Sequence, residues 1–418
     1  MKRFLSVLLI LLAAPLGAAE WDVPVQAGAI SQTLAKAADG DVLRLGPGTY
    51  QENVVLDRAV TLDGQGHATI DGQGNGTVIS VTGDDVVVTG VTVIGSGSDH
   101  GTIDSGIKLT KTATGVVVRN NVVLGNLYGI DIHGAKKVLV QGNVIEGRQD
   151  RRMNDRGNGI YVWNAPGAVV DGNDVRWGRD GIFVNSSRRN IFKNNRFRDL
   201  RFAVHYMYAN DSEVTGNVSI GNDLGYAVMF TSRVKVIGNV SIDDREHGVM
   251  FNYANDSVIR DNYVRGAKAK CTFLYNSNKN DFSGNWFEGC AIGIHFTGSS
   301  KNQIVGNNFV ANRTQVKLVS TDWFEWSVEG RGNYWSDNAG FDVDGDGVAD
   351  APFRPNDSMD HVLWTQPAAK LLMGSPAVQL VRWSQAAFPA LLPGGVIDSN
   401  PLMKPQMPEA GRKVEDNG

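Results

Sequence analysis

The chain has few cysteines: only Cys271 and Cys290 occur among its 418 residues. They lack the short spacing typical of zinc-binding cysteine pairs, which disfavours a thiolate metal site. They are 19 residues apart, which places them on neighbouring coils of the repeat described below, where strands stack about 4.8 Å apart. We expect a disulfide bridge, with two buried free thiols as the next alternative.

Long apolar runs are also missing, apart from a short one at the N-terminus. Lys2 and Arg3 precede the apolar stretch 4–12, and small residues follow at 17–19. This order is typical of a secretory signal peptide, which we place at residues 1–19. The apolar stretch is too short for a membrane anchor, and no later stretch reaches about 18 apolar residues. We therefore expect an exported, soluble chain.

Several catalytic and nucleotide-binding motifs are absent. The chain contains no GxxxxGK[ST] sequence, no HExxH and no GxSxG, so it should not bind ATP through a P-loop or act through those two active-site motifs. The net charge is −4, and loss of Lys2 and Arg3 makes it −6. An acidic balance argues against nucleic acid as a partner.

What the sequence does contain is a short repeat. Asparagines recur at steps of 22, 30, 22, 22, 22, 23, 23 and 22 residues. They are Asn121, Asn143, Asn173, Asn195, Asn217, Asn239, Asn262, Asn285 and Asn307. A period this short, with β-formers between turn residues and 49 glycines, predicts an all-β fold, a right-handed parallel β-helix solenoid. The asparagines themselves are expected to be structural, because their amides can bond to the next coil.

The boundaries follow from where the repeat begins and fades. We expect a capping helix over 30–38 with Ser31 as its cap, since an open solenoid end exposes strand edges. The solenoid should occupy residues 20–320. The eight extra residues between Asn143 and Asn173 should form a loop near 148–155. Residues 321–418 should form a less regular C-terminal extension, with an acidic loop and a proline-interrupted tail that caps the last coil or docks to a partner.

One strand of each coil carries a pattern that predicts a metal site. It reads small-apolar-x-apolar-x, and strand alternation turns the x positions outward. The first x position gives Asp131, Tyr161, Phe183, His205, Met229, Met250, Leu274 and His295; the second adds His133, Met207 and Asn252. Thioether and imidazole together suit copper, especially Cu(I). We therefore take His205, Met207, Met229, Met250 and His295 as candidate copper ligands, against the alternative of an apolar stripe covered by a loop or partner.

A second candidate site is the run Asp342-x-Asp344-x-Asp346-Gly347, followed by Asp350. Alternating carboxylates before a glycine resemble the first half of an EF-hand loop. The glutamate expected at the twelfth position is replaced by Phe353. We interpret the run as a structural Ca²⁺ loop or a solvated acidic turn.

The chain as a whole resembles a known family. The stretches 41–50 and 60–64 look like the opening of secreted carbohydrate-binding and sugar-hydrolase β-helices. The later Gly-Asn-Tyr-Trp-Ser-Asp at 332–337, followed by the acidic loop, is similar to the NosD family. That resemblance implies a periplasmic β-helix attached to an ABC-type membrane subunit and its separate ATPase. It also implies a role in assembling the copper centres of nitrous oxide reductase.

The function expected from these observations is a non-enzymatic copper-handling protein. It would accept copper from a donor chaperone and pass it to the apo nitrous oxide reductase. Two alternatives stay open. One is a polysaccharide lyase, epimerase or hydrolase, for which Asp131, Asp180 and Asp199 are candidate acids, although they do not share a column. The other is a structural docking module without copper.

Overall fold

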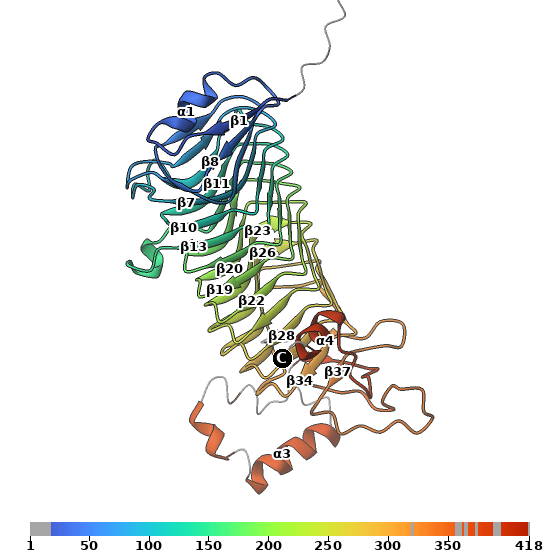
Figure 1. The fold of residues 1–418 in the computed structure, drawn as a ribbon. Coiled ribbons are helices and arrows are strands. Elements are labelled where there is room, and N and C mark those ends of the chain that lie inside the picture. Colours follow the sequence, from blue (N-terminus) through green and yellow to red (C-terminus); the bar gives the residue numbers. More distant parts are fainter. Residues whose placement is uncertain are drawn as a thin grey trace, which may run out of the picture.

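The computed structural model describes residues 18–318, 322–355, 362, 367–372, 375–387 and 394–416. Most of the expected signal peptide therefore lies outside the described residues. The described chain forms an elongated stack of β-coils, with helix α1 at one end and helices α3 and α4 at the other (Figure 1). Neighbouring coils pair through parallel strands throughout the stack, which confirms the predicted parallel β-solenoid.

One wall of the stack is a 12-stranded sheet that receives one strand from each coil. Its strands are β4 (Val54–Leu56), β6 (Ile79–Val81), β8 (Ser105–Leu109), β11 (Tyr128–His133), β14 (Ile160–Trp163), β17 (Asp180–Asn185), β20 (Phe202–Met207), β23 (Leu224–Ser232), β26 (His247–Asn255), β29 (Lys270–Tyr275), β32 (Ile292–Thr297) and β35 (Val316–Leu318). We call this sheet the ligand wall, because it carries the predicted copper ligands.

The remaining walls belong to one 24-stranded sheet, to which most coils contribute two short strands. Its strands are β1 (Glu20–Val23), β2 (Val42–Leu45), β3 (Gly48–Gln51), β5 (Thr61–Asp71), β7 (Val87–Ile94), β9 (Val117–Arg119), β10 (Val122–Asn126), β12 (Leu139–Gln141), β13 (Val144–Gly147), β15 (Val169–Asp171), β16 (Asp174–Arg176), β18 (Ile191–Lys193), β19 (Arg196–Arg198), β21 (Glu213–Thr215), β22 (Val218–Ile220), β24 (Lys235–Ile237), β25 (Val240–Ile242), β27 (Val258–Arg260), β28 (Tyr263–Arg265), β30 (Asp281–Ser283), β31 (Trp286–Glu288), β33 (Gln303–Val305), β34 (Asn308–Val310) and β37 (Tyr334–Trp335).

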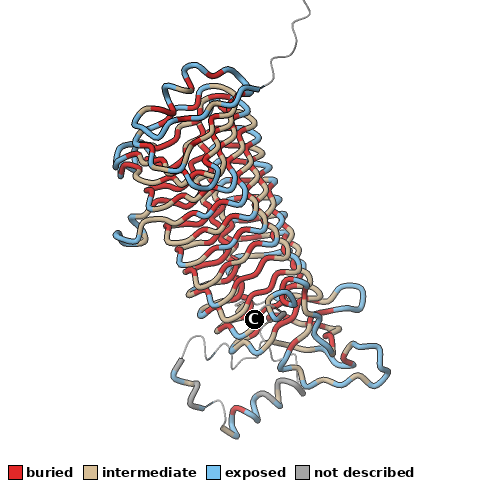
Figure 2. The backbone as a smooth tube through the Cα atoms, in the orientation of Figure 1, coloured by how far each residue is buried: buried red, intermediate tan, exposed pale blue. Residues whose placement is uncertain are grey.

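The interior combines an apolar core with a ladder of buried asparagines. Alternate strand residues face inward and form one continuous hydrophobic cluster along the stack. In Figure 2, buried residues colour the backbone tube red along the length of the stack. The side-chain oxygen of Asn217 accepts hydrogen bonds from the backbone and side-chain nitrogens of Asn195. The side-chain nitrogen of Asn217 donates to Phe192 O and to the next rung, Asn239. The structural role predicted for the asparagines is confirmed, since each rung joins neighbouring coils.

The N-terminal cap is shorter than the sequence suggested. Helix α1 spans Ala29–Leu34, and its first residue follows Gly28 rather than Ser31. The carboxylate of Glu52 accepts hydrogen bonds from the backbone nitrogens of Ile30 and Ser31, so it satisfies donors that a helix start leaves open. The expected end at residue 38 is wrong, because the chain tightens into three-residue turns after Leu34.

Two local features follow the sequence closely. The extra residues of the longest repeat form a projecting loop that contains the 3₁₀ turn η1 (Met153–Asp155) (Figure 1). Cys271 and Cys290 form a disulfide inside the stack, with their Cα atoms 5.6 Å apart. The bridge joins two neighbouring coils, as their spacing allows.

The C-terminal extension folds back onto the stack. Strand β36 (Trp323–Glu325) pairs with β38 (Gly395–Ile397), and strand β37 continues the 24-stranded sheet. The 3₁₀ helix η2 (Pro367–Leu372) and helix α3 (Pro376–Ala387) lie beyond the last coils (Figure 1). Helix α4 (Glu409–Asp416) packs Ala410 against an outward apolar patch that contains Val240, Tyr263 and Trp286. No helix in the described part of the chain has the length and apolar character needed to span a bilayer.

Candidate functional site

The outward face of the ligand wall is arranged in columns set by strand register. The first column reads Asp131, Tyr161, Phe183, His205, Ala227, Met250, Phe273 and His295. The second column reads His133, Trp163, Asn185, Met207, Met229, Asn252, Tyr275 and Thr297. The predicted outward placement of the five copper candidates therefore holds, but their order does not.

Two positions of the predicted first column are wrong. Met229 pairs with Met207, so it belongs to the second column, and Ala227 takes its place beside His205. The prediction placed Ala227 at the small-residue position of the small-apolar-x-apolar-x motif. In the structure Gly225 occupies that position. Leu274 faces the core, and Phe273 points outward in its place. The single line of His205, Met229 and Met250 does not exist.

The corrected register brings these three residues around one small side chain. Ala227 lies between His205 on the preceding strand and Met250 on the following strand. Met229 is two residues farther along the same strand as Ala227, on the same face, and Met207 is next to Met229. We call this group the Ala227 site.

Ala227 is covered although it points outward. Its neighbours Tyr226 and Val228 belong to the hydrophobic core, and Ala227 does not. It is nevertheless 0% exposed. A methyl group on the outside of a sheet can be fully covered only by the side chains around it, so the surrounding longer side chains close over Ala227.

His205 is held by a buried ion pair. Its Nδ1 lies 3.2 Å from Asp180 Oδ2, and Arg201 donates two hydrogen bonds to the same carboxylate at 2.8 and 2.6 Å. Burial by itself would raise the pKa of Asp180, but the bonds from His205 and Arg201 hold it below its usual value. A carboxylate only accepts hydrogen bonds, so Nδ1 is the donor in this contact and any lone pair of the ring is on Nε2.

That lone pair has no partner within the protein. His205 is 7% exposed, and its Nε2 is buried without a hydrogen bond in the described chain. The ring lies against Phe183, at 4.7 Å between ring centroids, and edge-on to Phe202 at 5.0 Å. Buried polar atoms are usually satisfied, so an unpaired imidazole nitrogen on a wall that also carries Met207, Met229 and Met250 is a candidate ligand position.

His295 does not belong to this group. Phe273 separates it from Met250 in the first column, and the Phe273 ring stacks on His295 at 5.0 Å between centroids. On the other side of Phe273 lies His247, at 5.6 Å between ring centroids. His247 was missed in the sequence because it precedes Gly248, outside the outward positions of the pattern. The candidate ligands thus fall into two groups along the wall.

The imidazoles of this second group stay neutral. Burial, with the charge of Lys270, lowers the pKa of His247 to about 4. Burial, with the charges of Lys270 and Lys317, lowers the pKa of His295 to about 3. The Nδ1 atoms of both rings are buried without hydrogen bonds within the described residues. At neutral pH each ring is therefore uncharged and keeps a lone pair on one of its two nitrogens.

The acids considered for a sugar-active enzyme are not assembled into one site. Asp131 is fully buried, 3.3 Å from Lys108 Nζ and 3.6 Å from His133 Nδ1. Asp180 is bound by Arg201, two coils farther along the wall. Asp199 lies outside the ligand wall, between strands β19 and β20. These carboxylates are separated, and the two on the ligand wall lie against basic side chains.

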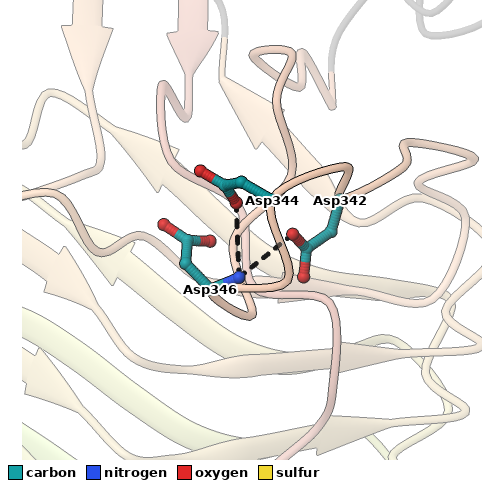
Figure 3. Close-up of side chains that lie close together, drawn as sticks. All are labelled: Asp342, Asp344 and Asp346. Atoms are coloured by element: carbon teal, nitrogen blue, oxygen red, sulfur yellow. Dashed lines mark hydrogen bonds between the residues drawn. The ribbon is translucent and has the colours of Figure 1, made fainter.

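The acidic loop brings three of its four aspartates together. Ligand atoms of Asp342, Asp344 and Asp346 lie within 4.8 Å of one another (Figure 3). The carboxylate of Asp342 already accepts hydrogen bonds from the backbone nitrogens of Gly345 and Gly347. Asp350 is outside the group and accepts a hydrogen bond from the Val343 nitrogen. The Ca²⁺ site stays a prediction.

Comparisons with known proteins bear on this arrangement. Residues 141–340 match the family described as "Periplasmic copper-binding protein (NosD)". Proteins named "Probable ABC transporter binding protein NosD" from Stutzerimonas stutzeri and Pseudomonas aeruginosa are 39% and 40% identical. Each alignment covers 89% of this chain, and 89% and 90% of those proteins respectively. A PL6 alginate lyase structure has a TM-score of 0.53 at 13% identity, covering 75% of this chain and 92% of that one, which shows the shared fold alone.

Proposed function

This chain belongs to the NosD family of periplasmic copper-binding proteins, and we propose that it binds copper at the Ala227 site. The ligands would be His205 Nε2 with the thioethers of Met207, Met229 and Met250. The observation that carries the proposal is the buried, unpaired Nε2 of His205 on the strand next to a covered alanine, Ala227, whose neighbours on the same face include Met229 and Met250, with Met207 next to Met229.

The donor set fits Cu(I) better than a harder ion. Thioether sulfur is a soft ligand that selects Cu(I), and neutral imidazole binds copper well. Asp180 would hold His205 in the tautomer that leaves Nε2 free, as outer carboxylates do for metal-binding histidines. Arg201 balances the charge of Asp180, so the neutral ligands would not face an unpaired buried anion.

We propose that this copper is cargo in transit. The site lies on the side of a rigid stack, and the methionines are only partly buried, so a second protein can approach them. The chain would act in the periplasm as part of an ABC-type membrane complex with a membrane subunit and its ATPase. It would receive copper from a donor chaperone and pass it to apo nitrous oxide reductase. The names of the relatives support the transporter association.

The experiment measures Cu(I) affinity by competition with a chromophoric chelator. Replacing His205→Ala, Met229→Leu and Met250→Leu together should weaken Cu(I) binding at least a hundredfold. A matched variant, His67→Ala with Met153→Leu, removes one imidazole and one thioether elsewhere and should bind as the unaltered chain does. X-ray absorption of the loaded protein should show sulfur and nitrogen neighbours.

A second variant tests the cluster without removing a ligand. Ala227→Leu adds bulk where the ligand side chains close, so it should weaken binding at least tenfold while all four ligand residues remain. Full Cu(I) affinity in both variants would refute the assignment. Absence of Cu(I) binding in the unaltered chain, with complex assembly intact, would favour the docking module.

A further inference from the structure

A row of exposed aromatic rings borders the Ala227 site. Tyr208 follows Met207, Phe230 follows Met229, and Tyr253 occupies the same position on the next coil. Their exposed fractions are 53%, 38% and 44%. The Tyr208 and Phe230 ring centroids are 5.2 Å apart, and those of Phe230 and Tyr253 are 5.3 Å apart. We call these three residues the aromatic row.

The backbone of the aromatic row is strained. Tyr208, Phe230 and Tyr253 have φ angles of 54°, 51° and 51°, in the left-handed region that bulky residues avoid. The same turn position in other coils holds small residues, and three of the four tolerate this region well: Asn164, Asn276 and Gly298, with Ser186 as the fourth. A left-handed conformation costs roughly 1–2 kcal/mol for each ordinary residue.

Stacking does not explain why the rings are there. The rings form three aromatic pairs, the third between Tyr253 and Tyr275 at 5.8 Å between ring centroids. An aromatic pair contributes about 0.5–1.5 kcal/mol, so three pairs offset the cost of three strained residues without a clear net gain. The rings also remain substantially exposed, so they gain little from burial. Strained, exposed aromatics held on a rigid scaffold are typical of a binding surface. Tyrosine, phenylalanine and methionine are also the types enriched at protein interfaces.

The charges around the row indicate the character of the partner. The turns that follow this position, from 186–190 to 298–302, carry five basic and two acidic side chains. They are Arg188, Arg189, Arg233, Lys279 and Lys301, against Asp211 and Asp256. Arg188 and Arg189 lie on the coil before the row and Lys279 on the coil after it, and none of these three forms a salt bridge within the described chain. The turns that flank the row are therefore basic, whereas the row's own turns hold Asp256 and the paired Asp211 and Arg233.

We propose that the aromatic row is the docking surface for the protein that receives copper from this chain, a partner with an apolar contact patch rimmed by acids. This rests on the proposed function, because the row is continuous with Met207 and Met229. A copper ion can pass directly between proteins only if both ligand sets meet, so the partner must cover the methionines. Covering them places its edge on the adjacent rings and its rim against the basic turns.

The test replaces each ring of the row with asparagine, the residue found at the same turn position in two other coils, at Asn164 and Asn276. In Tyr208→Asn, Phe230→Asn, Tyr253→Asn, the strain is relieved and no copper ligand changes, so the melting temperature should be unchanged or higher. The probe is purified apo nitrous oxide reductase, with binding followed by interferometry in the absence of copper. We expect the Kd to rise at least tenfold in the variant, and also in the unaltered chain between low and high salt.

Three further measurements distinguish failure of the docking surface from failure of the copper site. Phe341→Asn, which removes an exposed ring from the C-terminal extension, should leave reductase binding unchanged. Cu(I) affinity against a chelator should stay within twofold in the triple variant. Copper transfer to the reductase should slow at least tenfold. Unchanged reductase binding by the triple variant would overturn the docking surface. If the unaltered chain does not bind Cu(I), the proposed function is overturned. The two outcomes can be told apart, because docking is measured without the metal.

Discussion

The two faces of the solenoid treat buried polar groups in opposite ways. On the inside, the side-chain amide of each central asparagine forms hydrogen bonds with neighbouring coils, as Asn217 does with Asn195, Phe192 and Asn239. On the ligand wall, the Nε2 atom of His205 has no hydrogen-bond partner among the described residues, and neither have the Nδ1 atoms of His247 and His295. The same 22-residue period builds both faces. The comparison teaches that the ladder maintains the stack, whereas the wall is free to carry chemistry.

This separation has a physical basis. A side chain inside the stack meets residues from two neighbouring coils, so its polar atoms are usually satisfied within the protein, with the Tyr206 hydroxyl as an exception. An outward side chain has one open side, where a ligand can complete it. Changes to the inside should therefore cost stability, and changes to the wall should cost binding.

The largest effect should come from breaking the ladder. Asn217→Ala would leave the backbone nitrogen of Asn195 and the carbonyl of Phe192 without these partners inside the stack. Each unsatisfied buried group costs roughly 1–3 kcal/mol, so the free energy of unfolding should fall by about 3–5 kcal/mol. Urea denaturation measures this loss. Cu(I) affinity of the folded variant should stay at the unaltered value, and a joint loss would show that the faces are coupled.

The next effect concerns a carboxyl group on the inside. Asp244 accepts hydrogen bonds from Ser219, Ser241 and the nitrogen of Asn222, yet burial raises its pKa to about 7. Between about pH 4 and pH 7 the Asp244 carboxyl is ionised in the unfolded chain and protonated in the folded chain. Stability should therefore fall as pH rises through this range and stay level above it.

The variant Asp244→Asn isolates that contribution. It keeps an acceptor for Asn222 and cannot ionise, so it should be more stable than the unaltered chain at pH 8, by roughly 2–4 kcal/mol. The advantage should shrink towards pH 4. Urea midpoints of both proteins at several pH values measure the difference, and parallel pH curves would contradict it.

The smallest stability effect should come from the wall. Met207→Leu with Met229→Leu keeps partly buried apolar side chains of similar volume, so the free energy of unfolding should change by less than about 1 kcal/mol. Cu(I) affinity should still fall, because leucine has no sulfur. A large loss of stability would mean that the methionines serve packing, as the apolar-stripe alternative holds.

Much of the fold could be predicted from the residues. The asparagine period set the coil length, and strand alternation told inward from outward positions for seven of the eight residues in the first column. Coil spacing allowed the disulfide, and the structure decided it against two free thiols. The predicted register was wrong at Met229, because its coil contains two small residues, Gly225 and Ala227. The pattern alone cannot tell which of them begins the small-apolar-x-apolar-x motif. Only strand pairing with the coil before and the coil after decides that choice.

The sequence by itself determined a parallel stack with a polar ladder inside and soft ligands outside, because both follow from a local period. The tertiary structure alone decided which ligands meet. The salt link of Asp180 and Arg201, the covered methyl group of Ala227 and the position of His247 depend on contacts between coils more than 20 residues apart. Such contacts arise from how coils stack, and no single repeat encodes them.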